Sequence, residues 1–136
     1  MLIAIPKETA PGELRAAIIP DTVKKLVRMG AEVSLEVGAG TGSGFSDGDY
    51  ETAGASIASD KASLLGAADV VLRVRKPELS DVELLKPGSI HVSFLDHLVA
   101  RLQLCFGFAV ARVTPVDLVV RGGVEPSVAS NTLRAG

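Results

Sequence analysis

Short apolar runs alternate with amphipathic segments along this chain. Residues 2–5 are apolar and are followed by Pro6, which is typical of a strand covered on both faces of a parallel sheet. Residues 21–29 place apolar side chains on one face of a helix and basic ones on the other, and Gly30 is positioned to end that helix. Residues 32–37 alternate polar and apolar side chains, as a second strand would. Together these segments predict a β-loop-α-β unit with a right-handed crossover and parallel strands.

The remaining sequence keeps this rhythm of strand, loop and helix, with Ser59 expected to cap one helix. Further strands are predicted at residues 56–58, 70–74, 89–95 and 109–113, and further helices at 46–54, 61–65 and 98–106. This order predicts an α/β fold, a doubly wound and mostly parallel open sheet with helices on both faces, of the Rossmann or flavodoxin-like class. We expect residues 1–112 to form this domain. Residues 113–136, which end in a stretch rich in Gly, Ser, Pro and Asn, are expected to be a divergent, poorly ordered tail.

Length and charge narrow the classes of partner. The 136 residues are 47% hydrophobic, which suffices for one core and is too few for two ordinary domains. The 14 basic and 16 acidic side chains give a net charge of −2, so no strong field favours nucleic acid or an anionic membrane. The longest apolar-rich stretch, residues 98–116, is interrupted by arginines and a proline and is expected to be soluble core. A small molecule or another protein is therefore the expected partner.

A glycine-rich run at residues 38–44 follows the second predicted strand and precedes a helix. A Gly-x-Gly in that place can cradle a dinucleotide pyrophosphate with backbone N–H groups. The third glycine of a GxGxxG pattern is missing, however, because Ser43 or Phe45 stands there, and Asp47 and Asp49 would repel a phosphate. A flexible turn that needs positive φ values is the favoured interpretation, and the dinucleotide site is the alternative.

Two clusters of charge follow strands, at the sheet edge where open α/β folds bind ligands. In the loop at residues 7–15, Arg15 could hold a carboxylate in a bidentate fork or could be a solvated surface residue. Arg73, Arg75 and Lys76 come at the end of a later strand, with the two arginines expected on one face. An anionic ligand or a carboxylate on a facing loop would explain this charge, although a solvated turn is the simpler interpretation.

Three other side chains that carry chemistry give weaker signals. His91 alternates into a sheet face and is expected to be a core histidine, whereas His97, after a predicted strand, is the better proton-transfer candidate. Cys105 is the single cysteine and is expected to be a buried thiol. No Cys or His spacing indicates zinc, so no metal site is predicted.

Six blocks of the sequence resemble, in order and spacing, the N-terminal domain shared by alanine dehydrogenases and the α subunit of proton-translocating NAD(P) transhydrogenase. The blocks lie at residues 3–8, 12–17, 20–30, 38–47, 53–55 and 69–77. The resemblance covers residues 1 to about 96 and implies the α/β fold predicted above. It also implies that the chain lacks the second, dinucleotide-binding domain of that family, which carries the true GxGxxG pattern. Divergence beyond Asp96 could be natural or could reflect a shift of reading frame.

The resemblance assigns roles to the charged clusters. Arg15 matches the arginine with which alanine dehydrogenases hold the pyruvate carboxylate. The catalytic lysine of those enzymes lies two residues before the proline, where this chain has Arg75, and an arginine does not release its proton. Residues 94–96 resemble the transhydrogenase version of a strand end at which alanine dehydrogenases carry a catalytic histidine. The resemblance therefore implies an anion-binding set of Arg15, Arg75 and Lys76 and no catalytic side chain.

Cofactor contacts are implied only in part. Arg121 and Ser127 match a loop that contacts NAD in transhydrogenases, whereas Val124, Pro126 and Ala129 depart from it. NAD is thus expected to bind the complete enzyme and to bind this chain weakly or not at all.

The implied function is that of the N-terminal segment of a transhydrogenase α subunit, inactive by itself. Its parent enzyme passes hydride directly from NADH to NADP⁺, coupled to proton translocation, and needs no side-chain acid or base. The expected partners are NADP-binding and membrane components, with homo-oligomers in the complete enzyme, at a cytoplasmic location peripheral to the inner membrane. Neither nucleic acid binding nor direct membrane insertion is expected. The alternatives are the substrate domain of an alanine dehydrogenase, which deaminates alanine to pyruvate, or of a lysine-forming relative, and a non-catalytic binding or scaffold module.

Overall fold

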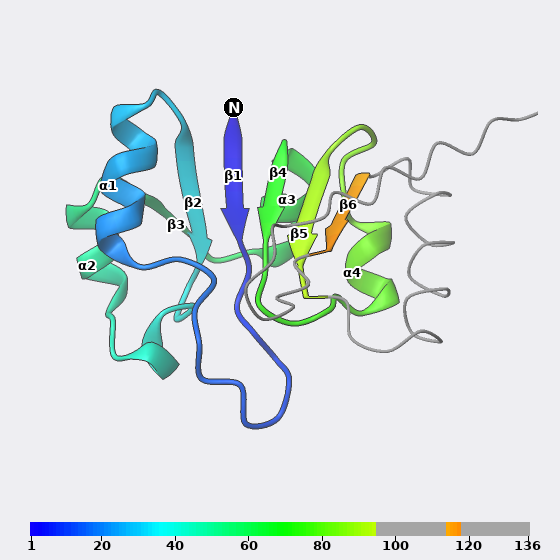
Figure 1. Cartoon of the computed structure of the whole chain (residues 1–136), viewed down its shortest axis with the longest axis horizontal. Helices are drawn as coiled ribbons and strands as arrows, with labels where there is room; N and C mark the ends of the chain where they lie inside the picture. The colour runs from blue at the N-terminus through cyan, green and yellow to red at the C-terminus, as the bar shows by residue number, and fades with distance from the viewer. Residues whose placement is uncertain (95–113, 118–136) are drawn as a thin grey trace, which may run out of the picture.

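Parallel strands form one twisted sheet at the centre of the molecule (Figure 1). A computed structural model of the chain describes residues 1–94 and 114–117. Within these residues the sheet has six strands in the order β3-β2-β1-β4-β5-β6, and every neighbouring pair is parallel. The strands are β1 (Leu2–Ile5), β2 (Glu32–Glu36), β3 (Ser56–Ala58), β4 (Val70–Leu72), β5 (Ile90–Ser93) and β6 (Thr114–Asp117).

Helices cover both faces of this sheet. They are α1 (Pro20–Arg28), α2 (Asp47–Thr52), α3 (Lys61–Ala67) and α4 (Leu79–Glu83), with a 3₁₀ turn, η1, at Thr41–Ser43. Ile3 and Ile5 of β1 pack in one apolar cluster with Val23 of α1 and Tyr50 of α2. Ala4, which points to the other face, packs with residues of α3 and α4. The predicted doubly wound α/β fold is therefore confirmed.

Local sequence signals explain where the helices begin and end. Pro20 opens α1 at a position where its missing N–H is not needed, and Gly30 follows the helix with φ 88°. The Asp60 carboxylate accepts a hydrogen bond from the Ser63 N–H at 2.8 Å and caps α3. The prediction that Ser59 caps this helix was wrong, because the N-cap position directly before Lys61 is Asp60 and Ser59 lies one residue earlier.

The predicted elements need three corrections, two for strands and one for a helix. Strand β4 ends at Leu72, two residues before its predicted end, and β5 is also shorter than expected. Helix α4 was not predicted, because its five residues are too few to show a periodic pattern. The predicted helix at 98–106 and strand at 109–113, and also Cys105, lie outside the described residues.

Strand β6 lies within the residues that were expected to form a tail. Its residues pair in parallel with β5, so that Val92 stands opposite Val116. The proposed domain boundary at residue 112 stays a prediction.

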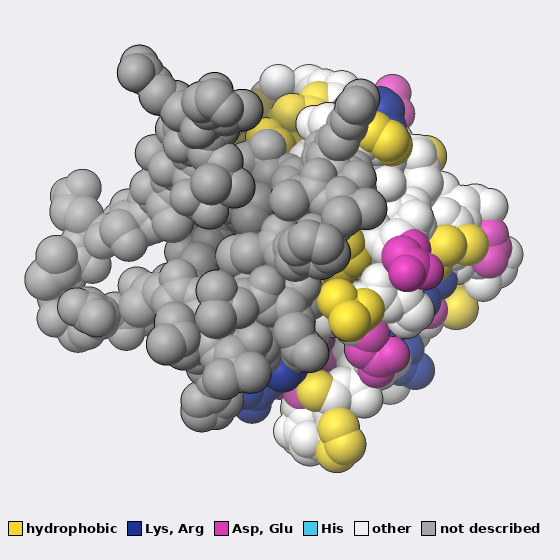
Figure 2. All heavy atoms as spheres, turned by 90° about the vertical axis from the view of Figure 1, so that its right-hand side faces the viewer, with side chains coloured by type: hydrophobic (Ala, Val, Ile, Leu, Met, Phe, Trp, Pro, Cys, Tyr) yellow, Lys and Arg dark blue, Asp and Glu magenta, His cyan; other side chains and the backbone are white. Residues whose placement is uncertain are grey.

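The described part of the surface on one side of the molecule carries side chains of several kinds. In Figure 2 the described hydrophobic, acidic and basic side chains are interspersed there, in keeping with the nearly balanced charge of the chain. Among the described residues, no helix combines the length and apolar character that crossing a membrane requires.

The strand order reverses between β1 and β4, and this reversal positions the site. The chain leaves β1 toward α1 on one face, and it leaves β4 toward α4 on the other. Two loops that diverge from neighbouring strands leave a crevice at the carboxyl ends, where open α/β sheets bind ligands. The loop at residues 6–19 and the loop at residues 73–78 thus flank one crevice, although they are far apart in sequence.

Candidate functional site

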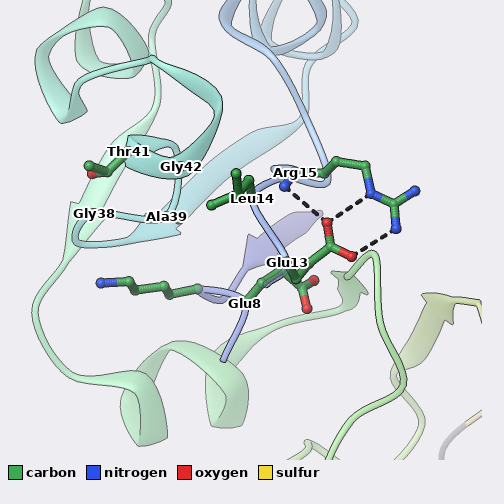
Figure 3. A pocket seen from close by; sticks show the side chains of 9 residues that line it. Glu8, Glu13, Leu14, Arg15, Gly38, Ala39, Thr41 and Gly42 are labelled. Carbon is green, nitrogen blue, oxygen red and sulfur yellow. Dashed lines mark hydrogen bonds and ion pairs between the residues drawn. The ribbon is translucent and has the colours of Figure 1, made fainter. Parts of the chain in front are cut away.

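A cleft of about 250 Å³ lies beside this crevice, at the carboxyl ends of β1 and β2 (Figure 3). It is lined by two loops, one after β1 and one after β2. The lining residues are Lys7, Glu8, Glu13, Leu14 and Arg15 from the first loop, and Gly38, Ala39, Thr41 and Gly42 from the second. The cleft therefore combines the charged loop and the glycine-rich run that the sequence analysis singled out.

The glycine-rich run acts as a clamp on the charged loop. The Ser43 hydroxyl donates to the Leu14 carbonyl oxygen at 2.8 Å and accepts from the Ala16 N–H at 2.7 Å. A Cβ on Gly42 would lie 2.8 Å from that same carbonyl oxygen, so only glycine allows this approach. The run thereby fixes the backbone on both sides of Arg15.

The same run leaves little room for a phosphate cradle. The Gly38 N–H donates to the Asp47 carboxylate at 2.9 Å. At the start of α2, the Ser46 N–H donates to the Asp49 carboxylate at 2.7 Å, which closes a capping box. Because these donors already serve the protein's own carboxylates, the geometry favours the structural turn over the dinucleotide site.

One carboxylate joins the two arginines that the sequence singled out. The Arg15 guanidinium donates to both Glu13 oxygens, from Nε to Oε1 and from Nη2 to Oε2, each at 2.8 Å (Figure 3). Arg75 donates from Nε to the same Oε2 at 2.8 Å. The structure thus brings Arg15 and Arg75 together on Glu13, which lines the cleft.

The Glu13 side chain is covered by the two arginines and is strongly ionised. Its side chain is 4% exposed, whereas those of Arg15 and Arg75 are 62% and 46% exposed. The hydrogen bonds from the Arg15 side chain and backbone, followed by the bond from Arg75, hold the pKa of Glu13 far below its usual range. The carboxylate is therefore fully charged at neutral pH.

A second carboxylate holds the two loops together. Glu8 accepts from the backbone N–H groups of Val74 at 2.6 Å and Arg75 at 3.4 Å. The loop after β1 therefore fixes the backbone that carries Arg75. The sequence indicated Glu8 and Glu13 only as members of a charged loop, and a carboxylate on a facing loop was one of the explanations considered for the cations.

Arg73 belongs to a different cluster, so the expectation that it shares a face with Arg75 was wrong. β4 ends before Arg73, whose buried guanidinium donates from Nη1 to Asp81 of α4 at 2.6 Å. Lys61 of α3 pairs with the other Asp81 oxygen at 2.7 Å. Burial alone would raise the pKa of Asp81, but the hydrogen bonds and charges of Lys61 and Arg73 outweigh it and lower the pKa.

His91 packs beside this buried cluster. It is 2% exposed, which confirms the predicted core position. Burial, together with the nearby Arg73 charge, lowers the pKa of His91 to about 4 against a weaker opposite effect of Asp81. His91 is therefore neutral at physiological pH, and it is not one of the residues that line the cleft.

The remaining candidates fall into two groups. Lys76 is exposed and directly follows Arg75. Arg121, Ser127 and His97 lie outside the described residues. In the described part of the chain, no group of three or more His, Cys, Asp or Glu side chains could hold a metal ion.

Comparisons with known proteins agree on one family for this chain. The model of the alanine dehydrogenase/PNT N-terminal domain matches residues 4–119, so the match runs past Asp96, where the resemblance was expected to fade. The first part of the NAD(P) transhydrogenase subunit alpha of Rhodospirillum rubrum is 46% identical over 106 residues, covering 74% of this chain and 28% of that protein. The alanine dehydrogenase of Halomonas elongata is 39% identical over 107 residues, covering 79% of this chain and 29% of that protein.

A solved structure agrees with these matches. The transhydrogenase from Sinorhizobium meliloti superposes with a TM-score of 0.80 and 31% identity, over 87% of this chain and 35% of that one. The chain thus spans about a third or less of the length of the relatives it matches.

Proposed function

Because the chain belongs to the alanine dehydrogenase/PNT N-terminal domain family, we propose that it is the N-terminal segment of an NAD(P) transhydrogenase α subunit. The parent enzyme would pass hydride between NADH and NADP⁺, coupled to proton translocation. In this proposal the segment supplies one wall of the hydride-transfer site and does no chemistry by itself.

The observation that carries the proposal is Arg75. It stands where the resemblance expects the catalytic lysine of an alanine dehydrogenase, two residues before Pro77. An arginine stays protonated in proteins, and this one donates to the Glu13 carboxylate at 2.8 Å. An enzyme that moves a proton to and from its substrate needs a titratable group at that point. Direct hydride transfer between two nicotinamides does not.

The proposal extends to cofactor, partners and location. NAD would bind the complete enzyme, with Arg121 and Ser127 as contacts from this chain, and the anion-binding set would be Arg15, Arg75 and Lys76. The partners would be NADP-binding and membrane components, in a homo-oligomeric complex on the cytoplasmic side of the inner membrane. The names of the transhydrogenase relatives support the cofactors.

A second candidate is the substrate domain of an alanine dehydrogenase. The position of Arg15 in the lining of the cleft favours it, as does the 39% identity to the Halomonas elongata enzyme. In that role Arg15 would hold the carboxylate of pyruvate or alanine.

A chimeric enzyme separates the two functions. The aligned region of this chain would replace its counterpart in the Rhodospirillum rubrum transhydrogenase subunit, and the product would be assayed with the other transhydrogenase components. We expect hydride transfer from NADH to NADP⁺ and no alanine-dependent reduction of NAD⁺. A chimera that also carries Arg28→Gln, at an exposed position on α1, is the control: it should behave like the unmodified chimera. Alanine-dependent NAD⁺ reduction without transhydrogenation would overturn the proposal in favour of the second candidate.

A further inference from the structure

The Lys7 ammonium differs from the other charged groups that line the cleft. Arg15 makes a bidentate fork with Glu13, and Glu8 accepts from the backbone of the loop at residues 73–78. Within residues 1–94 and 114–117, by contrast, the Lys7 ammonium has neither an ion pair nor a hydrogen bond. Its charge is therefore available to a ligand in the cleft.

A second donor lies close to this ammonium, across a glycine. A Cβ on Gly38 would lie 3.6 Å from Lys7 Nζ and 3.6 Å from Thr41 Oγ1, and Gly38 and Thr41 lie on the same wall of the cleft (Figure 3). Both groups therefore border a space that a side chain would fill, and the glycine leaves that space open. After a small movement of the flexible lysine, a ligand oxygen in this space would accept hydrogen bonds from the ammonium and from the hydroxyl.

Two carboxylates hold the backbone that carries these donors. Glu36 accepts from the Lys7 N–H at 2.8 Å, and Asp47 accepts from the Gly38 N–H at 2.9 Å. Lys7 and Gly38 follow β1 and β2, which are paired neighbours in the sheet. The positions of both segments are thus set by the fold before any ligand arrives.

We propose that Lys7 and Thr41 bind the carboxylate of a small, singly charged ligand in the space beside Gly38. The site goes beyond the proposed function, because direct hydride transfer between two nicotinamides requires no bound carboxylate. It is also separate from the set of Arg15, Arg75 and Lys76, of which only Arg15 lines the cleft.

The surroundings favour a ligand with one negative charge. One ammonium matches one carboxylate, and the carboxylates of Glu36 and Asp47, which bond to the backbone of Lys7 and Gly38, would repel a doubly charged phosphate more strongly. Leu14, whose side chain is 67% exposed, lines the same cleft and offers an apolar contact to the rest of the ligand. A monocarboxylate with a short apolar group therefore fits the site better than a phosphate does.

The test measures the binding of acetate to the full chain by NMR. Amide signals of nitrogen-15-labelled protein are followed at about pH 8, where phosphate carries two charges, with chloride added to keep the ionic strength constant. We expect saturable acetate binding that shifts the signals of Gly38 and Thr41, and weaker binding of phosphate. Lys7→Gln should weaken acetate binding at least about ten-fold, and Thr41→Val, which removes only the hydroxyl, about three-fold.

Lys25→Gln is the matched control, because it removes an exposed positive charge on α1, and it should bind acetate like the wild type. An equal loss of affinity in this control would overturn the proposal, since it would show a response to net charge. The absence of saturable acetate binding, or equal affinity in the wild type and Lys7→Gln, would also overturn it. Phosphate that binds more tightly than acetate would overturn the assignment to a singly charged ligand.

Both substituted positions are exposed, so the variants should fold, and circular dichroism checks this. If Lys7→Gln does not fold, Thr41→Val decides the question, and acetate affinity equal to that of the wild type would then overturn the proposal. The chimera assay measures hydride transfer, so failure of the proposed function would show there and not in this titration.

Discussion

Single residues in this protein take their chemistry from their immediate neighbours. Arg73 and Arg75 are two positions apart, yet Arg73 is buried against Asp81, whereas Arg75 donates to Glu13, which lines the cleft. The sequence placed Arg75 correctly after a strand and identified His91 as a core residue, but it placed Arg73 inside that strand. It could not say which carboxylate each arginine meets, because those partners are 8 and 62 residues away in the chain.

The buried His91 predicts a specific dependence of stability on pH. Its pKa is lowered from 6.5 to about 4, so the unfolded chain takes up a proton at this residue before the folded protein does. The contribution of His91 is favourable above about pH 6.5 and is lost progressively as the pH falls toward 4. This loss amounts to about 3 kcal/mol of unfolding free energy.

The variant His91→Gln isolates this effect. Urea unfolding of both proteins, followed by circular dichroism between neutral pH and about pH 4.5, should show a shallower decline of stability in the variant. His97 and all carboxylates are present in both proteins, so their titration cancels in the difference. Parallel pH curves for the two proteins would show that the folded state accepts a proton at His91 as easily as the unfolded chain does.

At the level of elements, the glycine-rich run illustrates a pattern whose role depends on packing. Gly38 and Gly44 have φ values of 73° and 81°, which the predicted turn requires. Gly40 has φ −92° and is needed for a different reason. A Cβ there would overlap with the ring of Tyr50, whose hydroxyl donates to the Ile18 carbonyl oxygen at 2.8 Å. The run therefore packs against the segment that leads into α1.

This packing predicts opposite effects for two glycine substitutions. Gly40→Ala should destabilise the protein by about 1–3 kcal/mol, because the added methyl group must displace the buried Tyr50. Gly48→Ala lies in α2, where the nearest atom to the new Cβ is 3.7 Å away, and should stabilise by up to about 1 kcal/mol. Urea denaturation of each variant measures both free energies. Similar values for the two variants would mean that the close approach at Gly40 is not rigid.

At the level of the whole molecule, the reversal of strand order brings the loops after β1 and β4 together. The carboxyl ends of β1 and β4 are neighbours, so the loops that carry Glu13 and Arg75 meet there. Ion pairs and backbone contacts from Glu8 and Glu13 then join these loops across more than 60 residues of chain. Among the described residues, the cleft has charged side chains that could recognise a ligand, but it has no set of backbone N–H groups arranged to hold a pyrophosphate.

The whole-molecule architecture therefore predicts weak cofactor binding by this chain. Calorimetric titration with NADH should give no saturable binding at micromolar concentrations, because the N–H groups that would face a phosphate already donate to Asp47 and Asp49. The Rhodospirillum rubrum relative, of which this chain covers 28%, is the positive control in its full-length form. A micromolar dissociation constant for this chain would show that it carries a dinucleotide site of its own.

The sequence by itself determined the fold class and most elements, because the apolar run at residues 2–5 and the helical period of residues 21–29 are local signals of burial. It also placed Arg15 and Arg75 at the ends of strands. Tertiary structure decided that β4 lies beside β1, that Asp81 pairs with Arg73 in the core, and that Glu13 binds Arg15 and Arg75. These outcomes depend on contacts between segments distant in the chain, and such contacts leave no periodic pattern in the local sequence. For the same reason the sequence did not indicate that the Glu13 carboxylate would pair with both Arg15 and Arg75.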